Sequence, residues 1–248
     1  MTDGVPLTWV DPIPSTQVEL VARAREGAPV QALATTHQTA GHGRRDREWV
    51  CPPGGGLGLS VLLRPRRPDG WTWLPLLTGV AVVRAVERLR PLTDGLQAVP
   101  LRLKWPNDVL DPDGAKLAGL LAERVDQPSV PTACVLGIGV NLRTADLPAG
   151  AVGLDGLGVT RSADDLARAL LDEIVAWVSR WERGDAAVAG TYRDLCSTLG
   201  QVVRVSLPDA TQVSGPALSV DAHGRLVVMD GSSEVALSAG DVVHVRPR

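Results

Sequence analysis

The stretch VQALATTHQTAGHGRRDREWVCPPGGGLGLSVLLR, residues 30–64, places a loop rich in glycine and arginine between two apolar segments. VQALATTHQ and GLGLSVLLR have the aliphatic content of strands, and turn-forming residues separate them. Arg44, Arg45 and Arg47 gather in the loop although the formal net charge of the chain is −3. Taken alone, such a loop is more often a solvated turn. Glycine also lets backbone N–H groups approach a ligand, so the loop has the composition needed to hold a dense anion.

Upstream of the loop, the sequence predicts a short strand followed by a helix. WVDPIP is typical of a strand that runs into a turn, and the helix should start near Ser15. Thr16 and Glu19 stand at capping-box spacing. Gly27, followed by a proline, predicts the end of this helix.

Downstream, three further helices are expected. The first covers residues 74–90, which have an apolar face and carry charged residues toward the C-terminal end. The turn-forming residues PLTDG at 91–95 predict its end. The second covers residues 163–183 after Ser162, which would serve as its N-cap, and the third covers residues 186–198.

Three segments between these helices read as strands. VPLRLKW alternates apolar and charged residues, so its leucines and tryptophan should share one face. AKLAGLLAERV and SVPTACVLGIGVNL follow, separated by turn-forming residues. One face of the last strand is nearly bare of side chains and carries Ala133, Val135, Gly137, Gly139 and Asn141. A ligand could lie against that face.

The composition changes at residues 199–200, after which four or five short valine-rich strands are separated by turns. This pattern is typical of a small barrel. We therefore predict an α/β (α+β) fold: a domain at residues 1–199 with a mixed central sheet and packed helices, and an SH3-like β-barrel domain at residues 200–248.

Composition excludes several classes of protein. With 44% apolar and 21% charged residues, the chain has the content of a globular protein. WLPLLTGVAVV is too short to span a bilayer and the N-terminus lacks a signal-peptide pattern, so we expect a cytoplasmic protein without membrane contact. A pI near 5.8 argues against binding to nucleic acid. Three widely spaced cysteines favour neither a disulfide framework nor a metal site.

Lysine and asparagine are scarce and clustered. The chain has 23 arginines but only two lysines, Lys104 and Lys116, and only two asparagines, Asn107 and Asn141. A codon bias accounts for the depletion but leaves the clustering unexplained. A guanidinium group does not replace a flexible ammonium group, so the two remaining lysines should lie at positions where arginine could not perform the same function.

Four stretches together resemble the biotin protein ligases: ST at 15–16, QTAGHGRRDREW at 38–49, KWPND at 104–108 with KLAG at 116–119, and GIGVN at 137–141. That family has G-R-G-R-x-x-x-x-W, K-W-P-N-D, K-(hydrophobic)-(small)-G and G-(small)-G-x-N in this order. The resemblance spans residues 7 to about 145. It implies a fold like that of class II aminoacyl-tRNA synthetases, with a small C-terminal barrel.

The resemblance also implies a two-step reaction. ATP, with Mg²⁺, and biotin give biotinoyl-5'-adenylate, and a lysine of a biotin carboxyl carrier protein domain then takes the biotinoyl group. Preorganised cations suit a step in which two anions meet. The matching positions divide into catalytic residues (Lys116, Arg44, Arg47), biotin-binding residues (Ser15, Thr16, Gln17, Gln38, Gly41, His42, Gly43, Arg44, Lys116), ATP-binding residues (Arg47, Trp49, Lys104, Asn107, Asn141) and a Mg²⁺ ligand (Asp108). Segments 38–49 and 142–156 should close over the adenylate to exclude water.

Simpler interpretations remain open for several of these residues. Residues 106–108 could be only a turn, and Ser15 and Thr16 could be only helix caps. Trp49 could belong to the core. Lys104 could point to solvent as readily as contact a phosphate.

His42 departs from the family, which normally has arginine there. A neutral imidazole holds an anion less well than a guanidinium, so the grip on the adenylate should be looser. Gln17 likewise stands where the family commonly has asparagine.

Two alternative functions stay in view: a lipoate–protein ligase, which shares the fold, and a non-catalytic biotin-binding regulator. The catalytic pattern starts within ten residues of Met1, so we expect no DNA-binding role. The expected oligomeric state is a monomer or weak homodimer, in which the GIGVNL strand could pair with a second subunit.

Overall fold

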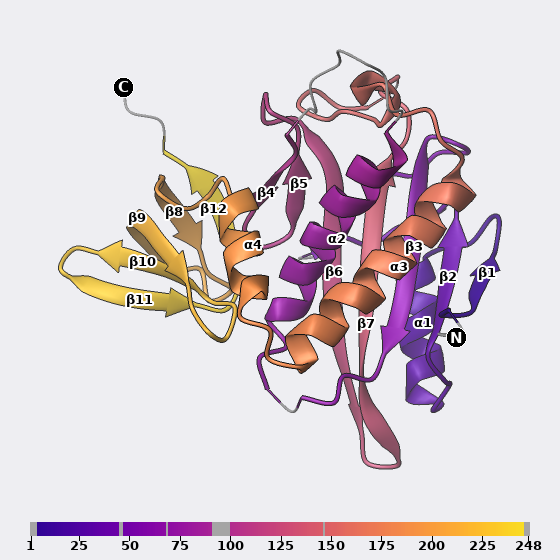
Figure 1. Ribbon diagram of the computed structural model, residues 1–248, viewed down its shortest axis with the longest axis horizontal. Helices are drawn as coiled ribbons and strands as arrows, with labels where there is room; N and C mark the ends of the chain where they lie inside the picture. Colours follow the sequence, from indigo (N-terminus) through magenta and orange to yellow (C-terminus); the bar gives the residue numbers. More distant parts are fainter. Residues whose placement is uncertain (1–3, 45–46, 68, 91–99, 146, 246–248) are drawn as a thin grey trace.

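A seven-stranded mixed sheet forms the centre of the molecule (Figure 1). The computed structural model describes residues 4–44, 47–67, 69–90, 100–145 and 147–245. The strand order is β1-β2-β3-β7-β6-β5-β4. β1 and β2 are parallel and the other neighbours are antiparallel. The strands are β1 (Leu7–Trp9), β2 (Gln31–Thr35), β3 (Gly56–Leu63), β4 (Arg102–Lys104), β5 (Asp108–Leu110), β6 (Lys116–Gln127) and β7 (Val130–Asn141). The predicted mixed α/β fold is confirmed.

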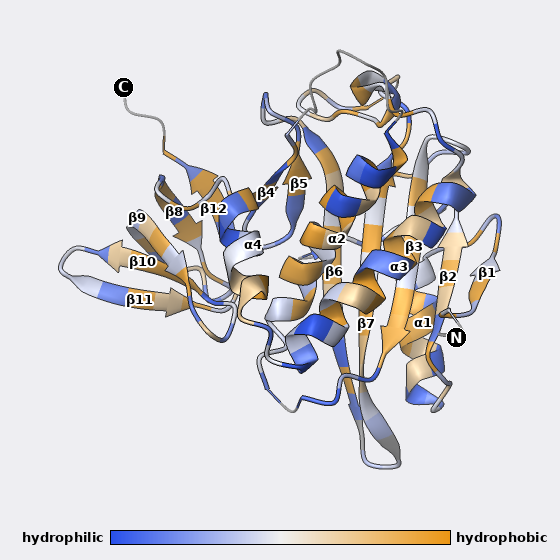
Figure 2. Ribbon diagram, in the orientation of Figure 1, coloured by the Kyte–Doolittle hydropathy of each residue, from blue (hydrophilic) through white to orange (hydrophobic). Residues whose placement is uncertain are grey.

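Helices cover both faces of this sheet. α2 (Trp73–Leu89) and α3 (Ala163–Glu182) lie together over one face, and α1 (Thr16–Arg25) packs on the other (Figure 1). The alternation of β3 explains the two layers, because Leu59 and Val61 join the core under α2 and α3 whereas Leu62 joins a smaller cluster with Leu20 of α1. Figure 2 shows the apolar character of β3, β7 and the middle of α2 that this burial requires.

The start of α1 differs from the predicted capping box. Ser15 is the N-cap, and its Oγ accepts a hydrogen bond from the Val18 backbone N at 3.4 Å. Thr16 is already helical, and Glu19 pairs with Arg23 one turn later. The Thr16–Glu19 capping box is therefore wrong by one residue, and the Thr16 hydroxyl is left for another partner.

The other predicted elements agree closely with the structure. α2 ends at Leu89, but PLTDG at residues 91–95 lies outside the described residues. Ser162 caps α3 as expected and forms a capping box with Asp165. α4 (Ala187–Leu195) follows, and a short 3-10 helix, η2 (Asp155–Leu157), precedes α3. Among the helices that the structure describes, none has the length and apolar content to cross a membrane.

β7 lies between β3 and β6 and is hydrogen-bonded to both. A strand paired on both edges has no free backbone groups to offer a second chain. The expectation that GIGVNL could pair with another subunit is therefore wrong.

The C-terminal part is a five-stranded antiparallel sheet of order β11-β10-β9-β8-β12. Its strands are β8 (Val202–Ser206), β9 (Gln212–Val220), β10 (Leu226–Asp230), β11 (Ser233–Leu237) and β12 (Asp241–His244). Four or five valine-rich strands in a barrel were expected, but β11 and β12 are edges and the sheet is not closed within residues 200–245. The sheet touches α2, where the Trp73 indole donates to the Ala222 carbonyl at 2.9 Å.

Candidate active site

A cavity of about 320 Å³ opens on the sheet face that carries α1, between the arginine loop, the residue 104–108 turn and the start of β12. It brings together residues from nearly every stretch that the sequence singled out. The predicted site residues that line it are Ser15, Thr16, Gln17, Gln38, His42, Gly43, Arg44, Arg47, Trp49, Lys104, Asn107, Asp108 and Lys116. Gly41 and Asn141 are close by but do not line it.

The arginine loop is a small hairpin. The Gly43 N donates to the Arg47 carbonyl at 2.6 Å, and the Trp49 N donates to the Gly41 carbonyl at 2.9 Å. A Cβ at Gly41 would overlap the Trp49 carbonyl and lie 2.7 Å from Nε2 of Gln38. Gly41 thus permits the close approach that shapes the loop, with Arg44 and Arg47 near its tip.

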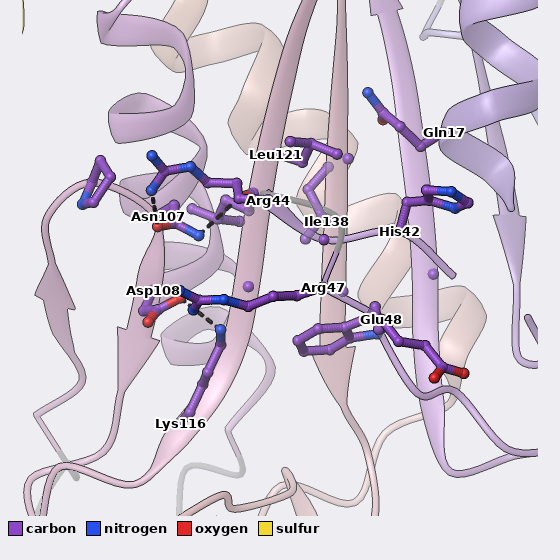
Figure 3. A pocket seen from close by; sticks show the side chains of 18 of the residues that line it. Gln17, His42, Arg44, Arg47, Glu48, Asn107, Asp108, Lys116, Leu121 and Ile138 are labelled. Carbon is purple, nitrogen blue, oxygen red and sulfur yellow. Dashed lines mark hydrogen bonds and ion pairs between the residues drawn. The ribbon is translucent and has the colours of Figure 1, made fainter. Parts of the chain in front are cut away.

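Arg44 reaches the turn that precedes β5. Its Nη1 donates to Oδ1 of Asn107 at 2.8 Å and to the Gly240 carbonyl at 3.3 Å (Figure 3). Asn107 in turn donates from Nδ2 to the Leu120 carbonyl at 3.2 Å. The KWPND segment is therefore more than a turn, because its asparagine links the loop guanidinium to β6.

Lys116 and Asp108 form an ion pair at the same end of the cavity, with Nζ 2.7 Å from Oδ1 (Figure 3). The Lys116 ammonium also lies 5.6 Å from the ring centroid of Trp49. Cations at this end thus come from the loop and from β6.

Lys104 adds a fourth cation to this wall of the cavity, after Arg44, Arg47 and Lys116. It is half-buried and lines the cavity, so it does not simply point to solvent. Burial, and secondarily the charge of Lys104, lowers the pKa of His244 on β12. The lining of the cavity carries four cations, Arg44, Arg47, Lys104 and Lys116, against three acids, Glu48, Asp108 and Asp241, in a chain whose net charge is −3.

Trp49 occupies part of the bare face predicted for β7. A Cβ at Gly139 would overlap the indole, and one at Gly119 would lie 2.9 Å from its Cζ3. The indole Nε1 is buried without a hydrogen-bond partner in the described structure. The Trp49 indole therefore packs on two glycines and forms a wall of the cavity. It is not part of the main core.

The opposite end of the cavity is polar but neutral. The Thr16 backbone N donates to Oε1 of Gln38 at 2.9 Å, and the Thr16 hydroxyl lies 2.8 Å from the Ser60 hydroxyl. Gln17 continues this group, accepting from Ser60 at 3.3 Å. Figure 3 shows Gln17 at the end of the pocket remote from Lys116. The two ends suit a molecule with an uncharged polar head and an anionic tail.

Comparison with known proteins identifies the family. A model described as the biotin/lipoate A/B protein ligase family matches residues 13–141. The chain belongs to this family. It is 41% identical over 242 residues to the biotin–[acetyl-CoA-carboxylase] ligase of Mycobacterium tuberculosis, covering 94% of this chain and 86% of the relative. The corresponding ligase of Paracoccus denitrificans is 31% identical, over 83% of this chain and 86% of its own length.

Solved structures of biotin protein ligases share the fold. The enzyme from Aquifex aeolicus in complex with biotin and ATP superposes with a TM-score of 0.79 at 24% identity, covering 98% of this chain and 99% of that one. The enzyme from Leishmania major in complex with biotinyl-5-AMP gives 0.65 at 24% identity, covering 98% and 99%.

Within this ligase fold, some predicted residues are placed differently from expectation. Asn141 is 6% exposed and donates from Nδ2 to the Lys116 carbonyl at 3.0 Å, so it holds the backbone of Lys116 and does not face the cavity. Gly150 and Val152 hold the same backbone through the Lys116 N and carbonyl, at 2.7 and 3.0 Å. Ser15 lines the cavity and also caps α1, so the two interpretations are compatible.

Other residues of this ligase site were missed from the sequence. Ser60 is a lone hydroxyl in the apolar strand β3, a signal that could have found it. Asp241 lines the cavity from β12 and forms an ion pair with Arg47. Nothing in the turn SAGD marks it as part of a site, because the contact depends on how the two sheets pack.

Proposed function

We propose that this chain is a biotin–protein ligase that makes biotinoyl-5'-adenylate from ATP and biotin and then transfers biotin to a lysine of a biotin carboxyl carrier protein domain. The observation that carries the proposal is the cavity with cations at one end and neutral hydroxyl and amide groups at the other. The two named relatives, each matched over 86% of its own length, support it.

In the first step, an oxygen of the biotin carboxylate attacks the α-phosphorus of ATP, the new P–O bond forms and pyrophosphate leaves. Two anions must meet, so fixed positive charge near the developing transition state lowers the barrier. Arg44, Arg47 and Lys116 are the proposed catalytic residues. In the second step, the carrier lysine attacks the anhydride carbonyl, AMP leaves and the amine loses a proton.

The neutral end of the cavity suits the apolar bicycle of biotin and its polar ureido edge. We assign biotin to Ser15, Thr16, Gln17, Gln38, His42 and Gly43, with Gly41 shaping the loop beside them and Arg44 and Lys116 toward its carboxylate. A neutral urea needs hydrogen-bond partners and no counter-charge, which the hydroxyls and amides supply.

ATP is assigned to the cationic end, at Arg47, Trp49, Lys104 and Asn107. Asn141 supports this end from behind through Lys116. The described residues contain no group of three His, Cys, Asp or Glu side chains suited to a metal ion. This fits Mg²⁺ that is held mainly by phosphates and water, with Asp108 as a protein ligand. The ion would neutralise phosphate charge.

We further propose that segments 38–49 and 142–156 close over the adenylate, and that residues 1–199 and 200–248 are separate domains, the second of SH3-like type. Arg44 and Arg47 both contact the second part, at Gly240 and Asp241. The protein would act as a monomer or weak homodimer.

One assay separates this function from its alternatives. The protein is incubated with ATP, Mg²⁺ and either biotin or lipoate, and pyrophosphate release and carrier labelling are measured. Biotin-dependent release followed by labelling is the expected result. Preference for lipoate would indicate a lipoate ligase, and binding of biotin without turnover would indicate a regulator.

A further inference from the structure

The neutral end of the cavity is anchored by a carboxylate that does not line it. Gln17, only 3% exposed, extends from the first turn of α1 to the central strands. Its Nε2 donates to Oε1 of Glu123 on β6 at 2.9 Å and to the Val135 carbonyl on β7 at 3.2 Å. Both hydrogens of the Gln17 amide are therefore used.

These partners fix which way the Gln17 amide faces. Carboxylate and carbonyl oxygens only accept hydrogen bonds, so the NH₂ group must point to Glu123 and Val135. The Gln17 Oε1 then lies on the other side, 2.6 Å from where a Cβ of Gly137 would stand. It accepts the proton of the Ser60 hydroxyl at 3.3 Å.

The Ser60 and Thr16 hydroxyls continue this network. Each hydroxyl has one proton, and the acceptors within reach are Oε1 of Gln17 at 3.3 Å from Ser60, the other hydroxyl at 2.8 Å, and Oε1 of Gln38 at 3.2 Å from Thr16. Both protons are therefore used within the group, which leaves the two hydroxyl oxygens as acceptors. Every free lone pair of this group on the cavity wall is thus an acceptor site.

Gln38 supplies the opposite polarity. The Thr16 backbone N donates to Oε1 of Gln38 at 2.9 Å, so the Gln38 NH₂ group faces the other way. Its Nε2 would lie 2.7 Å from a Cβ at Gly41 and 3.3 Å from one at Gly58, two positions where glycine leaves room. The wall therefore presents acceptors beside one amide donor, the complement of a cyclic urea with two N–H donors and one carbonyl.

We infer that Glu123 is a positioning residue that sets this donor and acceptor order, and so selects the ureido ring, through Gln17. The inference rests on the proposed function. Replacing Glu123 by glutamine would supply a donor as well as an acceptor, so the Gln17 amide could turn round. The Gln17 NH₂ would then face Ser60, and the donor and acceptor order of the hydrogen bonds from Gln17 through Ser60 to Thr16 would reverse.

The test compares Glu123→Gln with the parent protein on biotin and on a ring-oxygen analogue in which one ureido N–H is replaced by oxygen. A site built around a substrate N–H rejects the analogue that lacks it. In the variant, KM for biotin should rise about tenfold, the scale of one lost hydrogen bond, with kcat at saturation little changed. Discrimination against the analogue should shrink by a similar factor.

Two controls keep the result specific. Asp126→Asn removes another acid from β6, one that pairs with exposed Arg124, and should leave both KM and discrimination unchanged. Glu123→Asp keeps the charge and should recover part of the discrimination. If Glu123→Gln does not fold, Ser60→Ala breaks the same chain from β3 and should give the same rise in KM and loss of discrimination.

The outcomes separate two failures. A parent protein with no biotin-dependent pyrophosphate release would overturn the proposed function. An active parent whose Glu123→Gln or Ser60→Ala variant discriminates as well as the parent would overturn the role of Glu123 alone.

Discussion

Lys116 and Asp108 form a diagonal ion pair between the neighbouring strands β6 and β5, with the ammonium 2.7 Å from the carboxylate and both groups partly open to solvent. Partly exposed pairs of this kind add little to stability, on the order of 0–1 kcal/mol. The pair instead holds the ammonium at the cavity wall, ready to exchange Asp108 for an anionic ligand.

Replacing Lys116 by alanine should therefore impair chemistry more than folding. Loss of one preorganised electrostatic contact usually lowers a rate by about 10²–10³. We expect this reduction in biotin-dependent pyrophosphate release, with the thermal midpoint within a few degrees of the parent. An unaffected first half-reaction would make Lys116 structural. Arg84→Ala, on the solvent-facing side of α2 where Arg84 pairs with Glu87, is a suitable cation-removal control.

Gly139→Ala should disturb the wall formed by Trp49. The added methyl group would overlap the indole, which must move into the cavity. We expect weaker binding of ATP or biotin and altered tryptophan fluorescence. Gly190→Ala in α4, where nothing lies within 4 Å, is the matched control and should be neutral or slightly stabilising. Equal ligand affinity in both variants would contradict the assignment of the indole to the site.

His42→Arg should slow release of the adenylate. His42 is exposed on the cavity rim, and its Nδ1 contacts the Ala40 carbonyl at 2.9 Å, so this ring nitrogen is engaged by the backbone of the loop. A charge-assisted hydrogen bond from arginine is worth about 1.5–3 kcal/mol, which corresponds to roughly a 10- to 100-fold slower release. The measurement is the loss of preformed adenylate from the protein. The same rate in both forms would argue against a side-chain role here.

Asp155 should make the order of segment 142–156 depend on pH. Hydrogen bonds from the Thr144 side chain, at 2.6 Å, and from the Thr144 and Gly156 backbones lower the pKa of this carboxyl below 3.8. A lowered folded pKa means that the stabilisation is present above pH 3.8 and is lost as the pH falls through the folded value. The protection factors of the segment in hydrogen exchange, which correct for the slower intrinsic exchange in acid, should fall below that pH, and Asp155→Asn should show low protection at neutral pH as well. Unchanged exchange in the variant would disprove the role of this carboxylate.

Most of the fold could be predicted because the local signals were strong. Gly27 and Ser162 bounded helices, and strict alternation around Leu103 marked a strand. The capping residue of α1 was misplaced by one because Ser15 and Thr16 are both good caps, and the choice depends on the tertiary partner Ser60. Whether the C-terminal strands close into a barrel could not be predicted from the sequence either, since the pairing of edge strands is a tertiary property.

The candidate site was predictable in part for a similar reason. The resemblance to biotin protein ligases placed Arg44, Asn107 and Lys116 in one site, and the structure brings them onto one cavity. It did not reveal that Asn141 faces the backbone of Lys116, or that Glu123 anchors Gln17. Both contacts join distant segments through side-chain geometry that no local pattern encodes.

The ion pair between Arg47 and Asp241 joins positions 194 residues apart. During synthesis on the ribosome, the hairpin tip emerges long before its partner is made. A nascent or prematurely terminated chain that stops short of position 241 therefore lacks this partner of Arg47, and the ion pair can form only late in translation.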